Sequence, residues 1–117
     1  MDFYIEDRAI DDRIHVVAVA GEIDLFTAPE FKQRVSAPID AGRARLIVDL
    51  SAATFIDSSS LGVLIGAHRR LRRLNGTLVI VCNGESILKT FRITGLDGVF
   101  TIVPTLDEAF NGDAVGA

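Results

Sequence analysis

The sequence predicts an α/β fold, in which a mixed, mostly parallel five-stranded sheet opens with an antiparallel hairpin and carries about four helices. Three observations lead to this prediction. Two strand-like segments come first, separated by only a short polar break. Three later apolar segments are short and rich in β-branched residues, which is typical of strands covered on both faces. Segments with helical spacing lie between them, so the later strands are joined by crossovers and run parallel.

The strands follow from the apolar pattern. The hairpin pairs Phe3–Ala9 with Arg13–Ala20, because Ile10-Asp11-Asp12 supplies a short polar turn. The three later strands are Leu46–Leu50, Leu78–Cys82 and Val99–Val103.

The helices fill the gaps between these strands. Thr27 is expected as the N-cap of a helix over Ala28–Ala37, and Pro38 is expected to end or kink that helix. The other expected helices are Ser59–Leu74, Glu85–Thr94 and a short last helix after Thr105.

The parallel strands also predict where a site lies. Right-handed crossovers place the loops after these strands at one edge of the sheet, where binding sites form in such folds. The loops at that edge are Gly21–Phe26, Ser51–Ser59, Asn83-Gly84 and Pro104-Thr105.

Composition excludes several classes of protein. The 117 residues suit one domain over residues 1–111, with a flexible tail over residues 112–117. The net charge of −4 argues against direct nucleic acid binding, and no apolar run is long enough to span a membrane. Cys82 is the single cysteine, so no disulfide framework is possible and we expect a cytoplasmic protein. The N-terminus does not have the pattern of a signal peptide.

Two of the predicted loops carry residues of chemical interest. The first reads Gly21-Glu22-Ile23-Asp24-Leu25-Phe26-Thr27, and the second ends in Phe55-Ile56-Asp57-Ser58-Ser59-Ser60-Leu61-Gly62. The second resembles the signature of the STAS domain of anti-sigma factor antagonists, in which F-[IM]-D-S-S-G-L-G leads from a strand into a helix. The first resembles the G-E-[IL]-D segment of the same family. Order and spacing agree over nearly the whole chain, which implies an STAS-like fold.

The resemblance implies a function in signalling between proteins. Members of this family bind an anti-sigma factor that is a serine kinase, and a sigma factor is thereby freed for transcription. The kinase phosphorylates the serine after the motif aspartate, and a serine phosphatase reverses the modification. By position in the motif, the acceptor is Ser58, with Ser59 as second choice. The expected partner-binding residues are Asp24, Asp57, Ser58, Ser59, Ser60 and Leu61.

The same residues have simpler explanations when they are taken alone. A serine or aspartate before an apolar helix is commonly an N-cap, and Asp24 has the position of a solvated loop acid. A phosphate on Ser58 would still lie at the positive end of the helix dipole, near free amide groups. Ser60 stands where the family usually has glycine, and its side chain is expected to crowd a closely docked partner.

The sequence argues against an enzyme. No G-x-S-x-G elbow surrounds Ser58, and no phosphate-binding loop precedes Lys32 or Lys89. We expect no cofactor and no metal, because neither histidine has a partner at metal-ligand spacing. Cys82 ends an apolar strand and is expected to be buried and inert.

Two questions stay open at this point. The arginines within His68–Arg73 form either a solvated helix face or a docking surface for an acidic partner. The family also implies an alternative function, since STAS domains serve as non-switching subunits of signalling scaffolds and lipid-transport complexes, where the serine is unused.

Overall fold

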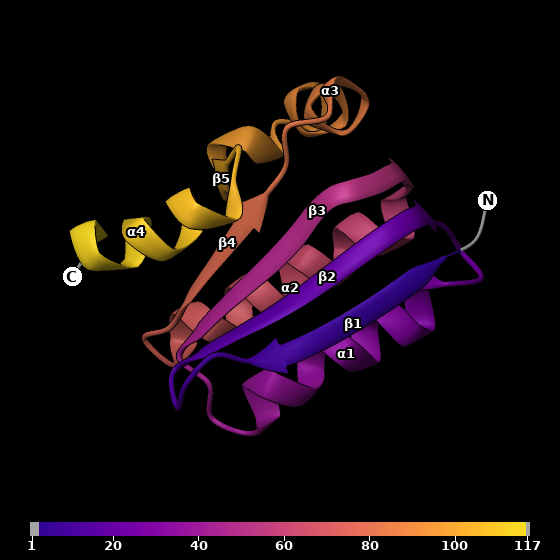
Figure 1. Ribbon diagram of the computed structural model, residues 1–117. Helices are drawn as coiled ribbons and strands as arrows, with labels where there is room; N and C mark the ends of the chain where they lie inside the picture. Colours follow the sequence, from indigo (N-terminus) through magenta and orange to yellow (C-terminus); the bar gives the residue numbers. More distant parts are fainter. Residues whose placement is uncertain (1–2, 117) are drawn as a thin grey trace.

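The computed structural model describes residues 3–116, with side chains described up to Asn111. Five strands form one sheet in the order β1-β2-β3-β4-β5, in which β1 and β2 are antiparallel and the rest are parallel (Figure 1). The strands are β1 (Tyr4–Ala9), β2 (Ile14–Ile23), β3 (Arg45–Ile56), β4 (Thr77–Val81) and β5 (Thr101–Val103). The helices are α1 (Ala28–Asp40), α2 (Ser58–Arg73), α3 (Glu85–Thr94), the 3-10 turn η1 (Leu96–Gly98) and α4 (Leu106–Gly116). The predicted fold class is confirmed.

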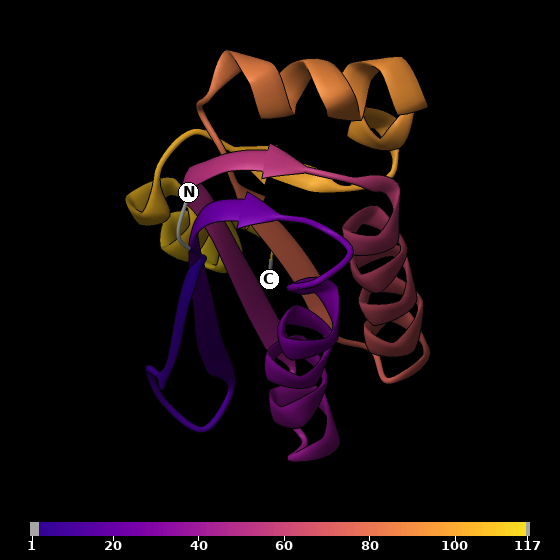
Figure 2. The same cartoon turned by 90° about the vertical axis from the view of Figure 1, so that its right-hand side faces the viewer.

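The three crossover helices lie on one face of the sheet. Each strand from β3 to β5 lies next to the strand before it, and always on the same side of that strand. Right-handed crossovers therefore place every connecting helix on the same face of the sheet. The larger core cluster joins this side, with Phe31 from α1, Leu64 from α2 and Phe91 from α3 all fully buried. The opposite face is covered in part by α4, as Figure 2 shows from the side. On this face, Ala109 of α4 belongs to a second core cluster with Ile47 and Val79.

β2 and β3 extend further than the sequence predicts. The expected loops Gly21–Phe26 and Ser51–Ser59 begin within strand, because β2 reaches Ile23 and β3 reaches Ile56. The two strands stay paired to their ends through two register shifts. Gly21 lies at the second shift with a φ of 87°, which glycine adopts without steric cost. Both strands therefore end at the predicted site.

Two further boundaries differ from expectation. Pro38 does not end α1, which continues to Asp40. The backbone of α4 reaches Gly116, whereas the sequence predicted an irregular tail from residue 112. The side chains of residues 112–116 and all of residue 117 lie outside the described part of the chain, so the flexibility of this segment stays a prediction.

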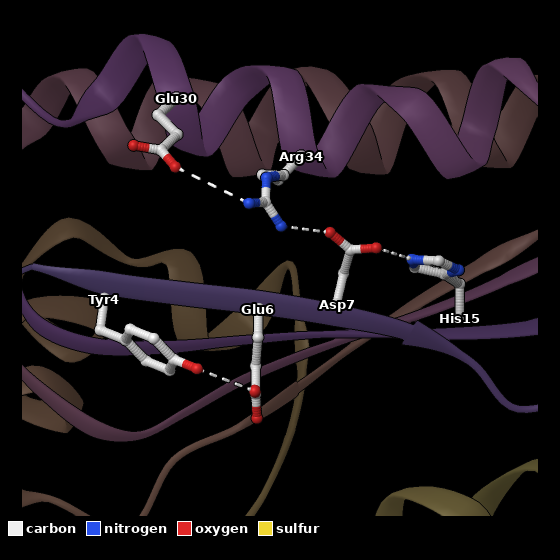
Figure 3. Close-up of polar contacts among 6 residues, drawn as sticks. All are labelled: Tyr4, Glu6, Asp7, His15, Glu30 and Arg34. Atoms are coloured by element: carbon white, nitrogen blue, oxygen red, sulfur yellow. Dashed lines mark hydrogen bonds and ion pairs between the residues drawn. The ribbon is translucent and has the colours of Figure 1, made fainter.

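An ion-pair cluster fastens β1 to α1 (Figure 3). The Asp7 carboxylate accepts a hydrogen bond from Arg34 at 2.5 Å and lies 3.0 Å from Nε2 of His15. Glu30 lies 3.9 Å from the other side of the Arg34 guanidinium. Partial burial by itself would raise the pKa of Asp7, but the hydrogen bonds from Arg34 and His15 outweigh it and hold the pKa below its ordinary value.

We predict that this cluster makes the fold less stable in acid. Because the folded chain lowers the pKa of Asp7 below 3.8, its carboxylate stabilises the fold above that value and loses this effect at lower pH. Asp7→Asn should lower the free energy of unfolding near neutral pH by about 0.5–1.5 kcal/mol. The difference from the wild type should shrink toward about pH 3, as measured by urea unfolding across a pH series. Asp12→Asn, in the exposed hairpin turn, is the control; a deficit for Asp7→Asn that stays constant with pH would contradict the prediction.

Candidate functional site

Ser58 begins α2 and presents its side chain to solvent. Asp57 precedes it in an extended conformation and is the N-cap of the helix, accepting a hydrogen bond from the Ser60 amide at 3.2 Å. Ser58 is exposed, and its hydroxyl has no hydrogen-bond partner among residues 3–111, whose side chains are described. Of the explanations left open by the sequence, capping therefore falls to Asp57, and the Ser58 hydroxyl is free for chemistry or contact.

Ser60 and Leu61 turn into the interior instead. Ser60 is fully buried, and its hydroxyl donates a hydrogen bond to the Ile23 carbonyl at 3.3 Å. Leu61 is buried in the main core cluster. The sequence placed both residues on the partner-binding surface, and expected the Ser60 side chain to crowd a partner. The structure differs because the Ser60 side chain fits inside the fold, where its hydroxyl is satisfied.

Ser59 has an intermediate position. Its side chain is half-buried and lines a groove between α1 and α2, so it faces along the helix pair rather than outward from the sheet edge. Of the three consecutive serines, Ser58 is the one that is exposed.

Asp24 organises the loop between β2 and α1. Its carboxylate accepts hydrogen bonds from the amides of Phe26 at 3.0 Å and Thr27 at 3.1 Å. The Thr27 hydroxyl accepts a hydrogen bond from the Asp24 amide at 2.8 Å, and it makes no capping bond to α1. Thr27 is the N-cap residue of α1, as the sequence predicts, but its hydroxyl is engaged in the Asp24 loop and does not cap the helix amides. Asp24 is half-buried rather than a solvated loop acid, and it fixes the shape of this loop.

The two motif loops meet at one edge of the sheet. Ile23 and Ile56 are paired in register at the ends of β2 and β3. The Asp57 amide then donates a hydrogen bond to the Ile23 carbonyl at 3.2 Å. The loop of Asp24 and the N-terminus of α2 are therefore held side by side, as the sequence predicted for this edge.

Three exposed apolar side chains lie at the same edge of the sheet as Ser58, and the sequence did not predict a role for them. Phe26 is 89% exposed and Leu25 66% exposed at the tip of the loop that Asp24 shapes. Phe55, near the end of β3, is 47% exposed. The presence of these large apolar residues inside predicted loops was the feature of the sequence that could have indicated them. Exposed aromatic residues at the same edge as a free hydroxyl are suited to contact with another protein.

Neither of the remaining titratable candidates is exposed. Burial lowers the pKa of His68, with a smaller effect from Arg72, and its ring packs edge-on against Phe100 with centroids 5.6 Å apart. Cys82 is buried, and this burial raises the pKa of its thiol. Within the described residues, no group of three or more His, Cys, Asp or Glu side chains is placed to hold a metal ion. None of the helices in that part of the chain is long and apolar enough to cross a membrane.

The fold and this site define a small α/β binding domain with an exposed serine at a helix N-terminus. Comparison with known families agrees, since residues 7–109 match the model of the STAS domain. The anti-sigma-B factor antagonist of Listeria monocytogenes is 33% identical over 102 residues, covering 87% of this chain and 90% of that protein. The anti-sigma-B factor antagonist of Bacillus subtilis is 31% identical over 86 residues, covering 74% and 78%. The chain belongs to the STAS-domain family of anti-sigma factor antagonists.

Solved structures place the fold in the same family. An anti-sigma factor antagonist from Mycobacterium paratuberculosis has a TM-score of 0.86 at 32% identity, over 95% of this chain and 93% of that one. The anti-sigma factor antagonist SpoIIAA in its unphosphorylated form has a TM-score of 0.76 at 18% identity, covering 97% and 100%. At that identity the second likeness concerns the fold alone.

The capping role of Asp57 yields a prediction about stability. Asp57→Ala removes the acceptor for the Ser60 amide and should lower the free energy of unfolding by about 1 kcal/mol. Asp57→Asn keeps a side-chain oxygen at the cap and should lose only a few tenths of that amount, about 0.3 kcal/mol. Thermal unfolding of both variants measures the difference. Equal loss in the two variants would show that the charge, and not the cap hydrogen bond, is what matters.

Proposed function

We propose that this chain binds an anti-sigma factor serine kinase, and that phosphorylation of Ser58 ends the interaction and so regulates transcription that depends on a sigma factor. The observation that carries the proposal is the free, exposed hydroxyl of Ser58 in an STAS domain. Ser58 lies at the sheet edge formed by the loop 24–27 and the start of α2, which we call the docking edge. Its relatives that are named anti-sigma-B factor antagonists support the choice of partner.

The physical effect of a phosphate at Ser58 supports a switch in binding. The group adds about −1.5 to −2 charges at neutral pH. The fold tolerates this charge, because it lies at the positive end of the α2 dipole and Asp57 already caps the helix. A partner that covers the edge must desolvate the phosphate beside the Asp57 carboxylate, which costs a few kcal/mol, or about 30- to 1000-fold in affinity. The switch therefore needs no change in the shape of the domain.

The proposed contact surface centres on Phe26 and Ser58. Phe26 and Leu25 supply apolar anchors, and Ser58, Ser59 and Asp57 supply polar contacts around them. Asp24 acts through the loop that it shapes, because its carboxylate is engaged by the Phe26 and Thr27 amides.

The proposal extends to the rest of the cycle. A serine phosphatase acting on phospho-Ser58 would return the protein to its binding form, and both reactions would take place in the cytoplasm. The chain itself has no catalytic role in this scheme, since among the described residues no base is bonded to the Ser58 hydroxyl. It binds neither nucleic acid nor membrane in this scheme.

We predict that phosphorylation occurs at Ser58. The wild type, incubated with ATP and each anti-sigma factor kinase of its host, should gain one phosphate by intact-mass and peptide mass spectrometry. Ser58→Ala should gain none and should still bind the kinase, because only the acceptor oxygen is lost. Ser59→Ala is the matched control and should still be phosphorylated. A phosphate mapped to Ser59 would overturn the residue assignment, and no phosphate from any kinase would favour the non-switching scaffold function.

A second prediction concerns the apolar anchor. Phe26→Ala should weaken binding to the kinase by about tenfold or more, since exposed aromatic side chains commonly dominate interface energy. Its effect on thermal stability should be small, because the side chain is 89% exposed in the free protein. Ile93→Ala is the control, since Ile93 is 73% exposed on α3. If calorimetry gave equal affinities for the wild type and Phe26→Ala, the loop tip would not be part of the interface.

A further inference from the structure

A groove of about 780 Å³ runs between α1 and α2, which lie side by side in Figure 2. It begins beside the docking edge, at Leu25 and Ser59, and extends to Arg70 and Arg73 near the end of α2. Small residues line it from both helices: Ala28 and Ser36 from α1, and Gly62, Gly66 and Ala67 from α2.

The two glycines in α2 are not required by the packing of the chain itself. Each lies inside the helix, where glycine costs up to about 1 kcal/mol relative to alanine. A Cβ atom placed on Gly62 or Gly66 would meet no other atom within 4 Å. Gly76 is different, because a Cβ there would lie 2.5 Å from the carbonyl oxygen of Ala44. The absent side chains at 62 and 66 keep the groove open for close approach from outside the chain.

Free cations border the same groove. Lys32 on α1 and Arg69 and Arg73 on α2 are exposed, and within the described part of the chain none of them is paired with a carboxylate. Arg70 differs, since it forms an ion pair with Asp40. Arg69 and Arg73 are four residues apart, so they project from one face of α2 toward the groove. The protein has a net charge of −4, and this groove is therefore a local exception that complements an acidic partner.

We propose that the groove docks an acidic amphipathic helix of a protein partner. The stretch of α2 from Ser59 to Arg73 is about 21 Å long at 1.5 Å per residue, which matches about four turns of a docked helix. The small residues allow its backbone to approach closely, and Leu25 and Val63 receive its apolar face. Lys32, Arg69 and Arg73 receive its carboxylates. A helix fits better than a small anion, because these three cations are spread along two helices and all are exposed.

The proposal rests on the proposed function only in taking the occupant to be a protein. Ser59 and Leu25 belong both to the groove and to the docking edge, so one partner can cover the two surfaces together. The acidic helix would then add specificity that does not depend on the state of Ser58.

The test uses the full chain and a synthetic helix as the probe. The probe is a peptide of about 18 residues made of Glu, Leu and Ala, with its leucines on one helical face, which is long enough to span the groove. A second peptide has Lys in place of every Glu. In NMR titrations, the acidic peptide should shift amide signals along the facing sides of α1 and α2. The basic peptide should bind at least about tenfold more weakly.

Matched variants test the groove residues. Arg69→Glu combined with Arg73→Glu should weaken binding of the acidic peptide by about tenfold or more. Gly66→Leu should weaken it by about fivefold or more without loss of thermal stability, because the new side chain fills the groove and replaces a helix glycine. Arg72→Glu makes the charge change of one of these two substitutions, on an exposed residue of α2 that does not line the groove, and should leave affinity within about twofold.

Several results would overturn the proposal. These are amide shifts centred elsewhere, equal binding of the basic peptide, or an equal loss in Arg72→Glu, which would indicate unspecific attraction. A concentration-dependent dimer in sedimentation that Gly66→Leu dissolves would assign the groove to a second copy of the chain instead.

Ser58→Ala should leave peptide affinity within about twofold. Failure of phosphorylation by host kinases would therefore count against the proposed function alone, and failure of the peptide titrations against the groove alone.

Discussion

The carbonyl oxygen of Ile23, at the end of β2, accepts hydrogen bonds from the Asp57 amide at 3.2 Å and the Ser60 hydroxyl at 3.3 Å. These bonds tie the N-terminus of α2 to the strand that leads into the Asp24 loop. The Ile23 side chain is itself fully buried, so the anchor cannot move without disturbing the core. Because both motif loops depend on this contact, the surface around Ser58 is organised before any partner arrives, which lowers the entropy cost of binding.

The roles of Asp57, Ser58 and Ser60 follow from these hydrogen bonds to the Ile23 carbonyl. Asp57 caps the helix, and Ser60 fills an interior position with its hydroxyl satisfied. The Ser58 hydroxyl makes no contact that stabilises the fold, so phosphorylation of its oxygen need not disturb the structure. If the phosphorylated residue were also the N-cap, each phosphorylation would disturb the cap, which contributes about 1 kcal/mol to the stability of the fold. Separating the two roles between adjacent residues avoids this conflict.

The same arrangement joins two surfaces of different character. The sheet edge carries the exposed apolar side chains of Leu25 and Phe26, while the groove between α1 and α2 is bordered by free cations such as Arg69 and Arg73. Apolar anchors contribute mainly to affinity, and charges contribute mainly to the rate and specificity of association. A phosphate on Ser58 would act on the first surface, where desolvation is most costly. The α1–α2 groove extends away from it along the helices.

Local periodicity was sufficient to predict much of this protein from its sequence. The β-branched segments at 46–50 and 78–82 and the helical spacing between them predicted the parallel crossovers, because hydrophobic patterns report which faces are buried. The motif around Asp57 and Ser58 predicted the family and the edge on which the site lies. The length of β3 escaped prediction, because residues 51–55 beyond its buried half are mostly exposed and lack the pattern of a buried strand, although β2 still pairs with Ala52, Ala53 and Phe55.

Only the tertiary structure distinguished the three serines from one another. They are chemically identical, and a helix turns each by about 100° from the last, so one faces solvent and another the core. Which one faces inward depends on the Ile23 carbonyl, which lies 37 residues earlier in the sequence and reaches Ser60 only after β2 and β3 pair. The exposure of Phe26 and the groove beside Gly66 likewise arise from the packing of separate elements. Local sequence patterns determine which segments form strands and helices, but contacts between distant residues decide which side chains remain available to a partner.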